Sequence, residues 1–96
     1  MTARQIYDEV IVADHPVLGA RVALVLPIIP EAAPYKIREG IARRRIAATT
    51  GVCPCGATID YSELQPGRAS AVEVRHEHGC PAVTKTLVKA IRRWCR

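Results

Sequence analysis

Apolar residues near the start of the chain recur at the spacing of a helix. Ile6, Val10 and Ala13 lie three or four positions apart, as they would on one helical face. A capping-box pattern at residues 2–5, with Thr first and Gln three positions later, precedes them. We therefore expect a helix over residues 3–13.

The apolar run that follows is compatible with a helix or a strand. Asp14 can cap a second helix. Residues 17–26, which follow it, are apolar apart from one arginine and one glycine. The β-branched run at residues 10–12 favours strands instead, so the alternative is a hairpin that pairs residues 5–13 with 20–29. The capping signal before each apolar run leads us to prefer the two helices.

A third helix is predicted after a bend marked by three prolines. Ile37, Ile41 and Ala48 recur on one helical face, which predicts a helix over residues 35–49. Gly51 follows this run and is a candidate C-cap, since glycine readily adopts the left-handed conformation that ends many helices.

The second half of the chain shows a different pattern. Residues 57–61 and 71–75 have the alternation of two strands, with a turn at 65–68 between them. Pro81 suits the first turn of a final helix. On a helical wheel this helix separates the cations Lys85, Lys89, Arg92, Arg93 and Arg96 from the apolar residues Val83, Leu87, Ala90, Ile91 and Trp94. We expect the apolar side to pack against the rest of the protein.

The chain has 96 residues, the size of one small domain. We expect a single domain over residues 1–96, with a mainly helical half (1–50) and a second half (51–96) made of a cysteine turn, a hairpin and a helix. With no phenylalanine and one tryptophan, the core must be built mainly from small aliphatic residues, and small domains commonly add a metal or disulfides. No segment has the length and apolarity of a membrane span or a signal peptide, so we expect a cytoplasmic protein without membrane contact.

Cysteine and histidine gather at two points that are about twenty residues apart. In a reducing compartment such residues bind metal more often than they form disulfides, and two disulfides are the alternative. The predicted ligands are Cys53, Cys55 and Cys80, with His76 preferred to His78 as the fourth. Sulfur and nitrogen ligands in this number suit a structural Zn²⁺ with no open coordination position.

The order of a cysteine turn, a hairpin and a second ligand pair at a helix start resembles the treble-clef zinc fold. Residues 53–56 match its Cys-Pro-x-Cys-Gly knuckle with one residue missing between the cysteines. The arginine-rich helix leading into residues 51–57 and the His-x-x-x-Cys-Pro-Ala run at 76–82 also resemble small cysteine-and-histidine proteins of actinobacterial phages and their relatives. The resemblance implies a treble-clef-like zinc module in the second half of the chain. With the helices expected over residues 1–50, we predict an α+β fold in which a helical N-terminal half packs on this module. The resemblance implies no activity, since the function of most such proteins is unassigned.

Charge indicates a polyanionic partner. The net charge is +5, and the last sixteen residues contain five cations and no acid. Such a stripe can follow a phosphate backbone, with Arg43, Arg44 and Arg45 as a second basic patch. Few aromatic residues are present for stacking on single strands. We therefore expect weakly specific nucleic-acid binding, the alternative being that the stripe is only a solvated helix face.

A protein adaptor is the second hypothesis. The apolar stretch at residues 17–29 would then be an exposed docking surface for a host protein, as in a phage or mobile-element factor, or a dimer interface. An enzyme is not expected. Residues 81–96 lack the His or Asn that would complete an HNH-type nuclease site. Zinc deaminases have His-x-Glu followed by Pro-Cys-x-x-Cys, whereas here the cysteine pair comes first and has a different spacing.

Overall fold

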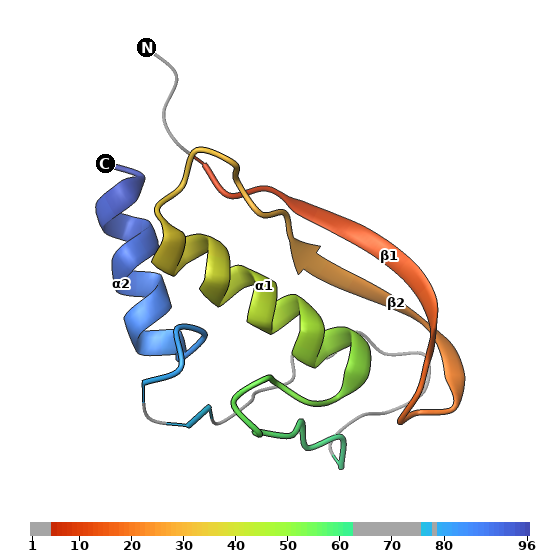
Figure 1. The fold of residues 1–96 in the computed structure, drawn as a ribbon. Helices are drawn as coiled ribbons and strands as arrows, with labels where there is room; N and C mark the ends of the chain where they lie inside the picture. Colours follow the sequence, from red (N-terminus) through yellow and green to blue (C-terminus); the bar gives the residue numbers. More distant parts are fainter. Residues whose placement is uncertain (1–4, 63–75, 78) are drawn as a thin grey trace.

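The computed structural model describes residues 5–62, 76–77 and 79–96, and these residues form a mixed α+β fold (Figure 1). The elements follow in the order β1 (Asp8–His15), β2 (Ala20–Pro27), α1 (Tyr35–Thr50) and α2 (Thr84–Trp94). β1 and β2 form an antiparallel hairpin. α1 lies between this hairpin and α2 and contacts β2 and α2. Neither helix has the length and apolarity needed to cross a membrane, as judged over the described residues.

The prediction of a helical N-terminal half is wrong, because strands come first. Instead of helices over residues 3–13 and from Asp14 onward, the chain forms the β1–β2 hairpin, which was the alternative. Val10 pairs with Val25, and burial alternates along β1 so that every second side chain faces the protein. A period of two therefore governs this segment, and its β-branched residues outweigh the capping signals.

His15 connects the hairpin turn to the rest of the protein. Among the described residues it is the one polar residue that is buried, with 3% of its surface exposed. Its Nδ1 accepts hydrogen bonds from the backbone N–H groups of Val17 and Leu18, each at 3.2 Å. Its Nε2 lies 2.9 Å from the carbonyl oxygen of Ala48 and 3.0 Å from the hydroxyl of Tyr61. Because Nδ1 accepts, the ring proton belongs on Nε2, which donates to Ala48.

The predicted third helix and its cap are confirmed by α1. Gly51 has φ 86°, and its N–H donates to the carbonyl of Ala47 at 2.7 Å. Ile37 and Ile41 are buried on one face, as expected. Near the end of the helix the buried small residue is Ala47, whereas Ala48 is half-buried.

The apolar side of α2 packs against the first half of α1. One core cluster contains Ala33, Ile37, Ile41 and Leu87, with Ile6, Ile29, Ala90, Ile91 and Trp94 packed against it. The helix begins at Thr84, so Pro81 precedes it and does not lie in its first turn as expected. The reason is a turn before it, in which the N–H of Val83 donates to the carbonyl of Cys80 at 3.1 Å.

The predicted strand over residues 57–61 is wrong, because the described residues there form only one isolated bridge, between Val52 and Thr58. Beyond the cysteine turn the segment bonds back to the end of α1, since the N–H of Ile59 donates to the carbonyl of Gly51 at 3.1 Å. The predicted turn at 65–68 and returning strand at 71–75 lie outside the described residues.

Gly40 allows α1 to approach the segment that leads into α2. A Cβ atom at this position would lie 2.6 Å from the carbonyl oxygen of Pro81 and 2.8 Å from Cδ1 of Leu87. Both distances are shorter than van der Waals contact, and the first involves backbone that cannot move independently.

We expect Gly40→Ala to destabilise the protein by about 1–3 kcal/mol, the usual cost of overpacking a core. The measurement is urea unfolding followed by circular dichroism. The clash of the added Cβ atom destabilises the protein, whereas helix propensity alone favours alanine over glycine by about 1 kcal/mol. A more stable variant would therefore contradict the close approach.

Candidate metal centre and basic surface

The cysteine turn after α1 is held by its own backbone. The N–H of Cys53 donates to the carbonyl of Ala57, and the N–H of Gly56 donates to the carbonyl of Cys53, both at 2.8 Å. Gly56 has φ 96°, a conformation that glycine adopts without the penalty other residues incur. As a result the Cys53 side chain is buried, and that of Cys55 lies at the edge of the protein.

A second turn places the other two ligating side chains. The N–H of Cys80 donates to the carbonyl of Glu77 at 3.0 Å, and Gly79 takes φ 87° within this turn. Cys80 is buried and His76 is half-buried. The turn directly precedes α2, so the start of that helix is tied to the position of Cys80.

The two turns bring four donor atoms together. The Sγ atoms of Cys53 and Cys80 are 3.8 Å apart. Nδ1 of His76 lies 3.6 Å from Sγ of Cys55 and 3.7 Å from Sγ of Cys80. All four donor atoms are within 4.8 Å of one another, so this group could hold a metal ion.

The distances suit a tetrahedral ion. With Zn–S bonds of about 2.3 Å and Zn–N bonds of about 2.0 Å, a regular tetrahedron has S···S separations of about 3.8 Å and S···N separations of about 3.5 Å. The separation between the sulfurs of Cys53 and Cys80 matches, and the separations of Nδ1 of His76 from the sulfurs of Cys55 and Cys80 are within 0.2 Å. The alternative of disulfides is not adopted by this structure, in which all four cysteines are free. Cys95 lies outside the cluster.

The structure places His76 in the cluster, as the sequence predicted. His78 lies outside the described residues. The cluster also contains the three cysteines expected from the sequence, Cys53, Cys55 and Cys80.

The cysteines differ in their tendency to ionise. Burial raises the pKa of Cys53 to about 11, although the backbone N–H of Cys55 donates to its sulfur and opposes this. Burial also acts to raise the pKa of Cys55, but donation from the backbone N–H groups of Glu77 and Ala57 and from His76 outweighs it and lowers the pKa to about 6. Near neutral pH Cys55 is therefore a thiolate and Cys53 a thiol, whose proton a metal ion would displace.

The three adjacent arginines of α1 are engaged inside the molecule. Arg45 donates to the carbonyl of Pro27 at 2.8 Å and to the carboxylate of Glu9 at 2.6 Å. Arg44 donates to the carbonyl of Ala82 at 3.3 Å, and burial lowers its pKa. These side chains connect α1 to the hairpin and to the segment before α2. Their guanidinium groups are therefore poorly placed to form a basic surface patch.

Arg43 contacts the metal cluster itself. Its Nε donates to Glu39 at 3.0 Å and forms an ion pair one helical turn apart. Its Nη1 donates to Sγ of Cys80 at 3.6 Å. Arg43 thus joins the central helix to one of the cluster sulfurs.

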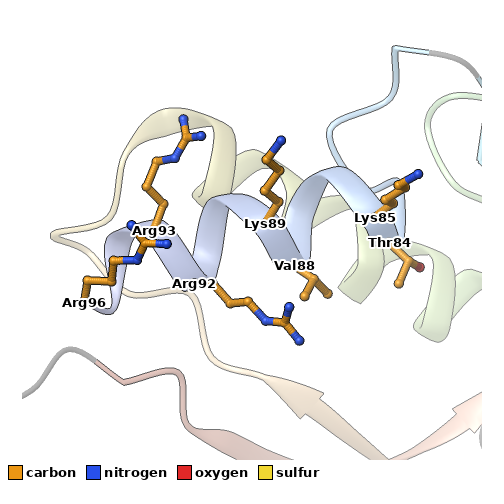
Figure 2. A pocket seen from close by; sticks show the side chains of 7 residues that line it. All are labelled: Thr84, Lys85, Val88, Lys89, Arg92, Arg93 and Arg96. Carbon is orange, nitrogen blue, oxygen red and sulfur yellow. The ribbon is translucent and has the colours of Figure 1, made fainter.

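The basic residues of α2 behave differently. Its exposed side has an open hollow of about 490 Å³, lined by Thr84, Lys85, Val88, Lys89, Arg92, Arg93 and Arg96. In Figure 2 Lys89 and Arg93 extend to one side of the helix axis and Arg92 to the other. All five cations of the predicted stripe are exposed and line this hollow.

Two roles were not evident in the sequence. His15 has no partner at short range beyond its own turn, so its contacts with Ala48 and Tyr61 could not be inferred. The contact of Arg43 with Cys80 spans 37 residues. The sequence offered two weak signals: His15 stands next to a proline, and Arg43 follows an acid by four residues.

Comparison with protein-family models, curated proteins and solved structures gives no match for this chain. The resemblance to treble-clef proteins of phages stays a prediction.

We expect one Co²⁺ or Zn²⁺ ion to bind per chain, with Co²⁺ showing the strong visible absorption of tetrahedral thiolate coordination. Zn²⁺ at about 100 times its Kd should stabilise the fold by about 2.7 kcal/mol, and a chelator should reverse this. Cys53→Ser should weaken Co²⁺ binding by at least about 100-fold, more than a second-layer contact costs.

Cys95→Ser is the matched control, because Cys95 is a free thiol outside the cluster. Equal loss of binding in the two serine variants would argue against the site, as would unchanged thermal unfolding with and without metal.

Metal affinity should rise with pH. Because the pKa of Cys53 is about 11, binding at pH 7–8 must release at least this proton, and the apparent association constant should increase about tenfold per pH unit for each proton released. Below the Cys55 pKa of about 6 a second proton is displaced, so the dependence should steepen. Competition titrations at several pH values measure this, and a pH-independent affinity would contradict it.

Proposed function

We propose that this is a small, zinc-stabilised protein that binds nucleic acid through the exposed side of α2 with weak sequence specificity. The observation that carries the proposal is the division of α2 into two sides. Leu87, Ile91 and Trp94 face the core cluster, while the five cations line one open hollow. The helix is therefore fixed in position with its charged side toward solvent.

The dimensions of this surface fit a phosphate backbone. Eleven residues of helix extend over about 16 Å, and one strand of duplex DNA presents about five phosphates over that length. The residues from Pro81 to Arg96 include no acid that would compete with phosphate. Counterion release would then make binding favourable and strongly dependent on salt.

The proposal of weak specificity follows from what lines the hollow. Its members other than the cations are Thr84 and Val88, so it offers no aromatic platform for base stacking. Lysine and arginine contacts to phosphates position a protein on a duplex without reading its sequence.

In this proposal the metal ion is structural. Four protein ligands complete a tetrahedral Zn²⁺ site and leave no position for water or substrate, so we assign no catalytic role. The ion would connect the turn at residues 53–56 to the start of α2. The cysteine turn followed later by a ligand pair before a helix is the basis for assigning a treble-clef-like module.

A protein adaptor is the second candidate, and the outer face of the hairpin favours it. Val10, Val12 and Val25 are 65%, 54% and 67% exposed, and Val10 and Val25 are direct partners across the strands. This apolar face could dock on a host protein or on a second copy. Such a complex would depend little on salt, which separates it from nucleic-acid binding.

We expect binding to a labelled DNA duplex to weaken by about 10²- to 10³-fold between 50 and 200 mM salt, as five phosphate contacts would require. The triple variant Lys89→Ala, Arg92→Ala and Arg93→Ala should bind more weakly at every salt concentration, with a salt slope reduced by about 3. Mobility shift or fluorescence anisotropy measures both.

The matched control is the triple variant Arg21→Ala, Lys36→Ala and Arg38→Ala. It removes the same charge at exposed positions outside the hollow. Equal weakening in the two triple variants would indicate a general charge effect and contradict the assignment to α2.

A further inference from the structure

Arg43 is the one member of the predicted basic patch that contacts the metal cluster, as far as the described residues show. Its Nη1 lies 3.6 Å from Sγ of Cys80, and its Nε is held by Glu39 at 3.0 Å. The two contacts use different nitrogens of one planar group. The carboxylate therefore orients the guanidinium while the sulfur accepts its hydrogen bond.

The charge of a loaded site explains why this contact matters. Three thiolates, a neutral imidazole and a divalent ion sum to −1. Cys53 and Cys80 are buried, with 1% and 5% of their surfaces exposed, so this charge has limited access to water and needs a partner. A guanidinium stays protonated at all relevant pH values. It also lowers the electron density on the sulfur that accepts its hydrogen bond.

We propose that Arg43 is a positioning residue for the metal centre, which holds the Cys80 thiolate in place, neutralises the excess charge of the site and slows metal release. The proposal rests on the proposed metal site. It assigns Arg43 to the metal and not to the nucleic acid. Removal of a residue that contacts a metal ligand, and not the ion, typically lowers metal affinity by about 10- to 100-fold.

The neighbouring basic residues of α1 provide contrasts. Arg44 and Arg45 donate to Ala82, Pro27 and Glu9, and not to a cluster sulfur. Arg38 lies on the same helix and is exposed. Arg38→Gln therefore removes the same charge from the same helix without touching the site and serves as the matched control.

The test compares Arg43→Gln, Arg43→Lys and Arg38→Gln in the full chain, with Co²⁺ and Zn²⁺ as probes. Affinity is measured by competition with a chromophoric chelator, and release by the rate of transfer to excess chelator. We expect Arg43→Gln to weaken Zn²⁺ binding about 10-fold or more and to accelerate release. The sulfur-to-cobalt charge-transfer band should move to lower energy, because an unassisted thiolate is more electron-rich. Arg43→Lys should restore part of each effect, and Arg38→Gln should match the unmodified protein.

Glu39→Gln is a second, milder variant that loosens Arg43 without removing it, and it should shift the same band in the same direction by a smaller amount. It carries the test if Arg43→Gln does not fold. Unchanged affinity and charge-transfer energy in the Arg43 and Glu39 variants would overturn the inference and leave the metal site standing. Equal effects of Arg43→Gln and Arg38→Gln would also overturn it. Failure of the unmodified protein to bind either ion would overturn both this inference and the metal site.

Discussion

Four ligand atoms converge from two short turns, and this convergence joins the segment that follows α1 to the segment that precedes α2. Cys53 and Cys55 follow α1, while His76 and Cys80 precede α2. Buried polar atoms are stable only when they have partners. A divalent ion would supply a common partner for all four and add its binding free energy to folding. The small apolar residues around the turns form a core cluster with Cys53 and Cys80.

α1 is the element that contacts the hairpin, the segment before α2 and the metal cluster. Three of its arginines contact three different parts of the protein: Arg45 the hairpin, Arg44 the segment before α2, and Arg43 the metal cluster. These three side chains are half-buried between the two layers and bond to internal acceptors, whereas Lys36 and Arg38 near the start of the helix are exposed. In α2, which has one open side, the same residue types extend into water.

The hairpin could not be distinguished from two helices by the spacing of its apolar residues. A nearly continuous apolar run satisfies the periods of both a helix and a strand, so local spacing cannot choose between them. The capping residues did not resolve the choice, because the residues near Asp14 that can start a helix can also form a tight turn. His15 shows why the turn prevails: its imidazole bonds to two backbone N–H groups within the turn and to the end of α1. That last contact spans 33 residues.

Features that depend on residues close together in the chain could be predicted from the sequence: the central helix with its cap at Gly51, the two-sided character of the final helix, and the cysteines and His76 that make up the cluster. Each follows from a local period or from the chemistry of a few neighbouring side chains. Tertiary structure alone decided the order of strands before helices, the close passage at Gly40, and the division of the basic residues into half-buried arginines that connect elements and an open surface of exposed cations. These depend on which distant groups meet, and the free energy of such contacts is set by burial and by the partners available, which local sequence does not contain.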